Sequence, residues 1–143
     1  MNWLELKEIF NDCEIIGEKL IIKSDLLKLI DFIKQKYHFT VLKSITAIDN
    51  QEEGIELVYR VYDVDDEEEL VISQTVFNNE AESISSVFDS AVADEREIYD
   101  LFGVKFIGNQ ELKRLYLPES WEGHPLKKDY QEKDERLNWN DEA

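Results

Sequence analysis

The sequence predicts an α+β fold, in which a single domain with a small, mostly antiparallel sheet packed by helices carries an extended C-terminal arm. The chain has 143 residues, a length that suits one domain. Apolar residues recur at helical spacing in some segments and alternate with polar residues in others. A short extended piece at 104–108 ends this patterning, and both prolines lie beyond it. We therefore divide the chain into a compact α+β domain, 1–108, and an extended arm, 109–143.

The first third of the chain combines helical and extended patterns. Residues 3–10 have apolar side chains close to helical spacing, which predicts a short amphipathic helix. Residues 15–22 predict one strand, or two short strands around Gly17. Ser24 offers an N-cap hydroxyl for a second helix over 25–37. One apolar stripe runs along that helix, formed by Leu26, Leu29, Ile30, Ile33 and Tyr37.

Three further strands are predicted as an antiparallel meander. Residues 39–45 form a β-branched run, and residues 55–63 have nearly alternating apolar and polar faces. The third strand is predicted over 70–76. Between the last two lies the acidic run 65–69, which we interpret as a solvated hairpin tip because like charges repel one another and avoid burial.

Two helices complete the predicted domain. One is expected over 80–88, and another over 95–102 that ends at Gly103, a natural C-terminal glycine. Asp94 and Glu97 have the spacing of a capping-box variant, which predicts that the last helix begins there.

Charge and hydropathy exclude several classes of function. The chain has 33 acidic and 16 basic side chains, for a formal net charge of −17. Such a field repels phosphate backbones and anionic lipids, so we expect no nucleic-acid partner. No run approaches the about 18 apolar residues of a membrane span. The N-terminus has no apolar region of a secretory signal, which predicts a cytoplasmic protein.

The sequence offers no site for catalysis, cofactor or metal. Cys13, His38 and His124 are its only soft ligands, too few for a conventional iron–sulfur cluster or a structural zinc site. The glycines of GVKFIGNQ have the spacing of a phosphate-binding loop, but Asn109 and Gln110 stand where Lys and Ser/Thr are needed. We therefore expect this chain to hold no cofactor.

The arm has the residue types of an interface. Trp121 and Tyr130 are large aromatics outside any periodic core, and Lys127 and Lys128 contrast with the acidic chain. Packing of Trp121 on its own domain is an equally good interpretation. His124 precedes a proline, which favours extended backbone, and we interpret it as a contact residue rather than a metal ligand.

A set of residues at fixed spacing over 94–130 adds a family resemblance. The first part is Glu95, Arg96, Glu97, Asp100, Phe102, Gly103, Phe106, Gly108, Leu112, Arg114, Leu115, Leu117 and Pro118. The second part is Trp121, Gly123, Pro125, Leu126, Lys128, Asp129 and Tyr130. Together they closely resemble the signature of the 30 kDa subunit family of NADH-quinone oxidoreductase, the respiratory complex I. Upstream, the α+β pattern extends the resemblance to about residue 24.

Three parts of the motif depart from the family pattern. Ala93 or Asp94 replaces a tryptophan, Asn109 and Gln110 replace His-Pro, and Lys127 replaces an arginine, which keeps the charge but loses bidentate geometry. The same domain type occurs in energy-converting [NiFe] hydrogenases and formate hydrogenlyases that are related to complex I. The motif leaves the choice between an NADH dehydrogenase and a hydrogenase open.

The resemblance implies a structural subunit of a membrane-associated oxidoreductase complex that couples electron transport to proton translocation. Such a subunit lies in the hydrophilic arm, on the cytoplasmic side of the cell membrane. It clamps the large 49 kDa-type subunit, which resembles the hydrogenase large subunit, beside the cluster-bearing small subunit. Iron–sulfur clusters, and nickel-iron or flavin, are expected in those partner subunits rather than in this chain.

The same resemblance implies which residues form the partner interface. On this interpretation Arg96, Glu97 and Asp100 fix the root of the arm, and Trp121 anchors it on the partner. Burial there would satisfy backbone groups that an isolated extended segment leaves to water. The simpler alternative is a solvated helix face with an Arg96–Asp100 pair. The full interface set is Glu95, Arg96, Glu97, Asp100, Gly103, Phe106, Gly108, Arg114, Pro118, Trp121, Gly123, His124, Pro125, Leu126, Lys127, Lys128, Asp129 and Tyr130.

A second hypothesis needs no resemblance. The chain would then be an acidic protein–protein interaction module, unrelated to electron transfer, that binds a basic partner through the run 65–69.

Overall fold

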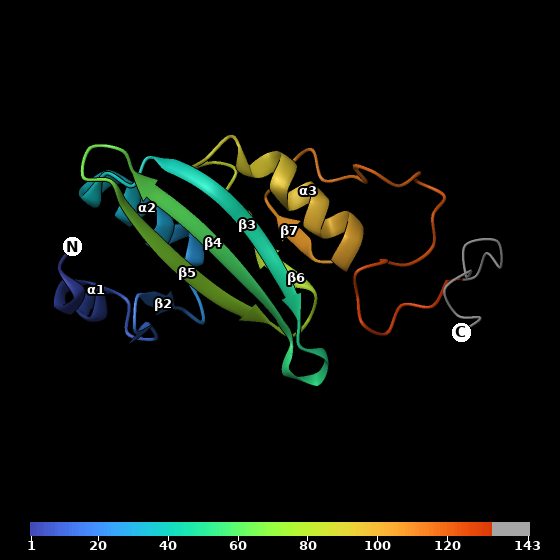
Figure 1. The fold of residues 1–143 in the computed structure, drawn as a ribbon, viewed down its shortest axis with the longest axis horizontal. Coiled ribbons are helices and arrows are strands. Elements are labelled where there is room, and N and C mark those ends of the chain that lie inside the picture. The colour runs from blue at the N-terminus through green and yellow to red at the C-terminus, as the bar shows by residue number, and fades with distance from the viewer. Residues whose placement is uncertain (133–143) are drawn as a thin grey trace.

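A five-stranded sheet organises the molecule, for which the computed structural model describes residues 1–132 (Figure 1). The strands lie in the order β1-β2-β5-β4-β3, and neighbours are antiparallel except for the parallel pair β2 and β5. Their bounds are β1 Glu14–Ile16, β2 Lys19–Ile21, β3 Val41–Asp49, β4 Ile55–Asp63 and β5 Glu68–Val76. The predicted α+β class with a mostly antiparallel sheet is therefore confirmed.

Three helices and a second, smaller sheet surround these strands. In Figure 1, α2 passes behind the sheet, and α3 lies beside the edge strand β3. The helices are α1 Trp3–Ile9, α2 Leu26–Tyr37 and α3 Ala91–Phe102, with a 3-10 turn at Gln51–Glu53. Strands β6 Glu80–Glu82 and β7 Lys105–Ile107 form a separate parallel pair. None of the helices within residues 1–132 is long and apolar enough to cross a membrane.

One apolar core joins α2 to the inner face of the sheet. The predicted stripe on α2 is buried at Leu26, Leu29, Ile30 and Ile33, and Tyr37 packs at its margin. On β4 the alternate residues Leu57, Tyr59 and Val61 enter the same core. Because these buried residues follow helical spacing on α2 and alternate positions on β4, the two periodicities in the sequence locate this core correctly.

The predicted meander β3-β4-β5 is confirmed, with β4 at its predicted bounds. Residues 64–69 are exposed, as expected for the acidic hairpin tip, and β5 begins at Glu68, inside the acidic run. Glu69 at this end pairs with Arg60 across the sheet, at 3.3 Å between Oε1 and Nη1. Pairing to β4 therefore continues two residues beyond the predicted strand.

The predicted helix over 80–88 is wrong. Residues 80–82 form β6, because their backbone pairs with β7, which lies far along the sequence and leaves no local signal. The last helix also begins earlier than predicted, at Ala91, with Ser90 at the N-cap position. Asp94 lies one turn inside α3, so the capping-box interpretation is wrong as well.

Ser24 is not the N-cap of α2. Asp25 holds that position in a left-handed conformation, with a φ of 59°, and Ser24 instead donates its hydroxyl to Asp12. The competing hydrogen bond joins Ser24 to the loop between α1 and β1, and local spacing does not indicate such a partner.

Candidate functional site

The arm leaves β7 and passes the C-terminal end of α3 (Figure 1). Within the described part, residues 109–132 contain turns and bends but no helix or strand. Residues 133–143 of the predicted arm lie outside the described residues. The question is what holds an irregular segment in place, since it has no ladder of backbone hydrogen bonds of its own.

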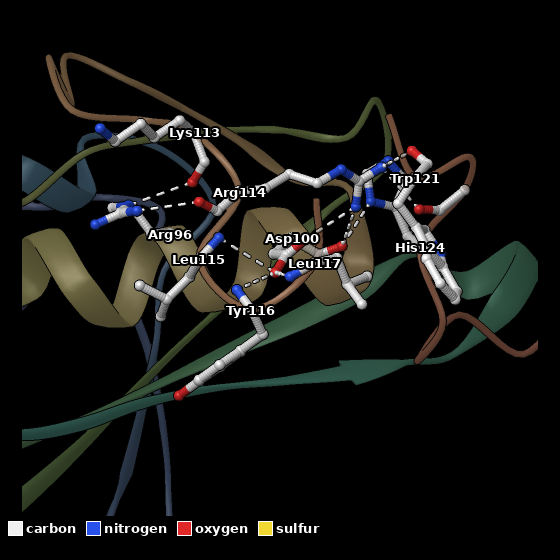
Figure 2. Close-up of polar contacts among 10 residues, drawn as sticks. Arg96, Asp100, Lys113, Arg114, Leu115, Tyr116, Leu117, Trp121 and His124 are labelled. Carbon is white, nitrogen blue, oxygen red and sulfur yellow. Dashed lines mark hydrogen bonds and ion pairs between the residues drawn. The ribbon is translucent and has the colours of Figure 1, made fainter. Parts of the chain in front are cut away.

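Asp100, in the last turn of α3, forms the centre of the attachment (Figure 2). Its side chain is fully buried. The Oδ2 atom accepts hydrogen bonds from the backbone N–H groups of Leu115, Tyr116 and Leu117, at 3.2, 2.8 and 3.1 Å. Three successive N–H groups that converge on one oxygen form a concave anion site, here filled by the chain's own carboxylate.

Arg114 completes this centre from the arm side. Its guanidinium is 10% exposed and contacts Asp100 twice, at the carboxylate Oδ1 (2.9 Å) and the backbone oxygen (3.0 Å). It also donates to the backbone oxygens of Trp121 and Gly123, both at 2.9 Å. Because the planar guanidinium presents several donors in a fixed geometry, one side chain ties two separate parts of the arm to α3.

Arg96 adds a contact one turn earlier on α3. It donates to the backbone oxygens of Lys113 at 3.3 Å and Arg114 at 3.0 Å (Figure 2). Arg96 and Asp100 thus each bind the arm rather than each other. Glu97, which we expected beside them at the root, is exposed.

Gly103 makes room for the middle of the arm. It ends α3 with a φ of +79°, and a Cβ atom there would lie 2.6 Å from Cδ2 of His124. The ring of His124 lies with Nδ1 2.9 Å from the backbone oxygen of Asp100, and the N–H of Leu126 donates to Leu101 at 2.9 Å. The arm therefore satisfies carbonyl groups that the C-terminal end of a helix leaves open.

A second attachment point lies at the end of β3. Asp49 is 7% exposed, and its carboxylate accepts the N–H of Gln51 and, 79 residues away in sequence, the N–H of Lys128, both at 2.9 Å. The sequence analysis missed this role. The contact to Gln51 is an Asx turn, which an Asp at the end of a strand favours, but nothing local indicates Lys128 as a partner.

The two attachment carboxylates have lowered pKa values. For Asp49 the N–H of Lys128 is the main cause, and it outweighs the effect of burial. Burial alone would raise the pKa of Asp100, but Arg114 and the three backbone N–H groups outweigh it and hold the pKa below its usual value. Both groups are therefore held in the charged form that the arm binds.

Glu95 behaves differently, although it lies on the same helix. Its carboxylate is fully buried and accepts hydrogen bonds from Ser83 Oγ (2.7 Å), Ile84 N (2.8 Å) and Asn109 Nδ2 (3.2 Å). Burial raises its pKa above the usual value in spite of these bonds. Glu95 therefore fixes the loop after β6 and the first residue of the arm from inside the body.

The remaining predicted interface residues differ in how far they are exposed. Phe106 is buried in the core, like Glu95, so neither presents its side chain at the surface. Trp121 is half-buried, with one side against its own chain, so both interpretations of this residue stay open. The others lie on the arm or its root with exposed or half-buried side chains: Gly108, Pro118, Gly123, Pro125, Leu126, Lys127, Lys128, Asp129 and Tyr130.

Across residues 1–132, no group of three or more His, Cys, Asp or Glu side chains could hold a metal ion. An open hollow of about 630 Å³ lies where the arm meets the β3–β4 turn, and it is lined by Asp49, Asn50, Gln51, Glu52, Glu53, Lys127 and Asp129. The hydrogen bonds around Asp100 and Asp49 attach the arm to the body.

Comparison with known sequences gives a consistent set of relatives. The family model of the respiratory-chain NADH dehydrogenase 30 kDa subunit matches residues 20–136. An NADH-quinone oxidoreductase subunit of Moorella thermoacetica is 36% identical over 134 residues, 88% of this chain and 90% of that protein. A longer NADH-quinone oxidoreductase subunit of Phocaeicola vulgatus is 40% identical over 128 residues, and the match covers 87% of this chain but only 23% of that protein.

Two solved structures have the same fold. One is a chain of the membrane-bound sulfane sulfur reductase, an archaeal respiratory membrane complex, with a TM-score of 0.75, 21% identity, and coverage of 90% of this chain and 82% of that one. The other is a trypsin-resistant fragment of Nqo5, with a TM-score of 0.61, 22% identity, and coverage of 76% and 96%.

Proposed function

The chain belongs to the respiratory-chain NADH dehydrogenase 30 kDa subunit family, and on this premise we propose that it is a cofactor-free assembly subunit of a complex-I-like membrane-associated oxidoreductase. It would lie in the hydrophilic part of the complex, on the cytoplasmic side of the membrane. The arm, from Lys113 to Tyr130, would dock on the large, 49 kDa-type subunit beside the small, cluster-bearing one.

One observation carries the proposal: the family match continues through the arm to residue 136, although the arm contributes little to the apolar core. A segment that adds little to the core is shared within a family for another reason, and for an irregular surface segment that reason is usually binding. In this chain the matching residues Asp100 and Arg114 hold that segment in one shape.

The outward side chains of the arm suit a protein partner. Tyr116 is 66% exposed and Leu126 is 52% exposed, and Trp121 lies half-buried between them in sequence. Large aromatic side chains that leave water on docking are enriched among the residues that supply most of the binding energy, and apolar neighbours help to exclude water around them. Lys127 and Lys128 add positive charge to a chain of net charge −17, which favours an acidic site on the partner.

The test is affinity purification of the tagged full-length chain from its own host, with mass spectrometry of the recovered proteins. We expect stoichiometric recovery of a large subunit and a cluster-bearing small subunit, and no visible absorption from this chain alone. A nickel-site large subunit would identify a hydrogenase, and a flavin-bearing subunit that oxidises NADH would identify an NADH dehydrogenase. Recovery of the chain only as a free monomer would contradict the proposal.

A pair of matched variants tests the role of the arm. Leu126→Ala removes an exposed leucine from the arm, and Leu4→Ala removes one that is 76% exposed on α1. We expect Leu126→Ala to lower the recovery of the large subunit severalfold and Leu4→Ala to leave it unchanged. Equal recovery with both variants would place the interface elsewhere on the molecule.

A further inference from the structure

We propose that the arm is folded onto the body before any partner binds, with Asp100 and Asp49 as positioning residues for the interface. This inference rests on the proposed function only in assigning the arm to a partner. From the sequence we expected burial on a partner to satisfy the backbone groups of the arm, whereas here the chain itself satisfies many of them. The family resemblance implies an interface, whereas the contacts within this chain indicate that the interface is preformed.

The first argument is that the chain itself satisfies the backbone of the arm. Asp100 accepts three consecutive N–H groups, and Arg114 donates to the carbonyl oxygens of Trp121 and Gly123. Further on, the N–H of Leu126 donates to α3. A partner is therefore not needed to satisfy these groups, which water would otherwise solvate in an extended segment.

The second argument is the burial of the ion pair at the root. Asp100 is fully buried and Arg114 is 10% exposed, and they lie 2.9 Å apart between Oδ1 and Nη1. A buried charge is stable only when its partners stay in place, since separation of the pair would leave a charge without compensation. This favours one arrangement of the root over many loosely populated ones.

The third argument is that β3, rather than α3, holds the arm at Lys128. Lys128 is bound by Asp49 at the end of β3, whereas the root is bound by α3. A segment that is fixed at 114–117, at His124 and Leu126, and at Lys128 loses most of its conformational freedom over 114–128 when the body folds. Docking then requires little further ordering, which strengthens binding without any additional contact.

Hydrogen exchange of the isolated full-length chain tests the inference directly. In the wild type we expect slowed exchange at the N–H groups of 115–117 and at Lys128. Asp100→Asn should speed exchange at 115–117 roughly tenfold or more, and Asp49→Asn should do so at Lys128 and Gln51, the two N–H groups that Asp49 binds, but not at 115–117. Asp31→Asn, the same change at an exposed position of α2, is the matched control and should change neither site.

The amides of the β3-β4-β5 meander separate positioning from a general loss of stability. A positioning role predicts that Asp100→Asn leaves their exchange unchanged. If that variant destabilises the whole sheet, Asp49→Asn provides the test, because its effect should be confined to the N–H groups of Lys128 and Gln51. Exchange in the wild-type arm as fast as in an unstructured peptide would overturn the inference.

Binding to the purified partner subunits completes the test. We expect Asp100→Asn to weaken binding by roughly tenfold or more and Asp31→Asn to leave it unchanged. A protected arm in a chain that captures no partner would refute the proposed function and leave the preformed arm intact. An unprotected arm in a chain that does capture the partner would refute the preformed arm and leave the proposed function intact.

Discussion

The body and the arm are stabilised in opposite ways. The body is stabilised by an apolar core to which three helices and both sheets contribute, so its stability is distributed over many side chains. The described arm, residues 109–132, is held mainly by hydrogen bonds and one ion pair, several of which converge on the carboxylates of Asp100 and Asp49. Order in a segment without an apolar core therefore depends on few groups. A single substitution should destabilise either the body or the arm and leave the other region unchanged.

The largest expected effect is in the body. Ile72, fully buried on β5, lies in the middle of the core. Ile72→Ala should lower the free energy of unfolding by about 2–5 kcal/mol, because it removes buried methyl groups and leaves a cavity. Urea denaturation measures this loss. The matched change Ile16→Ala, at a position 61% exposed on β1, should stay within about 0.5 kcal/mol of wild type. Similar losses in both variants would contradict the location of the core.

The next largest effect tests the contact between the arm and the C-terminal end of α3. Gly103→Ala places a Cβ against His124 at a φ of +79°, whereas Gly17→Ala meets nothing within 4 Å at a φ of +62°. Both variants bear the backbone cost of about 1–2 kcal/mol, but only the first also displaces His124. We expect Gly103→Ala to be the more destabilising in urea and to speed exchange at the N–H of Leu126. Equal losses of stability in the two variants, with the N–H of Leu126 still protected, would mean that a side chain at position 103 does not displace His124.

A smaller effect should appear with pH, and it has opposite signs in the two regions. The pKa values of Asp49 and Asp100 are lowered in the folded chain, so their contribution is complete above the ordinary Asp value of 3.8 and is lost as pH falls through the lowered values. The pKa of Glu95 is raised, so its contribution is complete below the ordinary Glu value of 4.5 and is lost as pH rises through the raised value.

Acidification should therefore first strengthen the body and then release the arm. Urea midpoints between pH 7 and 4 measure the first change, and the Glu95→Gln variant, which cannot titrate, should remove that part of the pH dependence. Exchange at the N–H groups of 115–117, followed below pH 4, measures the second. Release of the arm at a pH where Asp residues are still ionised would show that other groups hold it.

The smallest effect is expected at the acidic hairpin tip. Asp65 and Asp66 are exposed, and their N–H groups are bound by Asp63, so their own carboxylates are not needed for the turn. Changing both to Asn should alter stability by less than about 0.5 kcal/mol and leave recovery of partner subunits unchanged. Loss of partner recovery would favour the alternative hypothesis of an acidic interaction module.

Sequence patterns predicted the parts of the fold that are determined locally. Strand β4 has its predicted bounds because near-alternation of apolar and polar residues is typical of a strand, and the stripe on α2 follows from helical spacing. Strand β6 was missed because only three residues pair with β7, and its hydrogen-bond partners come after α3. Ser24 was misassigned for a similar reason, since its hydroxyl finds a partner outside the helix it precedes.

Part of the candidate site could likewise be predicted from the sequence, and part could not. The family resemblance pointed to Asp100 and Arg96 at the root, and both bind the arm, but it also included Glu95 and Phe106, which are buried. It could not point to Asp49, because that residue lies outside the matched motif and contacts the arm across 79 residues of sequence. Long-range hydrogen bonds between an acid and a backbone N–H have no periodic signature.

The parallel pairing of β2 with β5 has a consequence for the order of folding. The hairpins β3-β4 and β4-β5 join neighbours in sequence and close quickly, whereas β2 must wait until α2 and both of these hairpins are in place. Until then β5 is a free edge, open to pairing with another chain. We therefore expect the short β1-β2 hairpin, although synthesised early, to join the sheet late and to cover the free edge of β5.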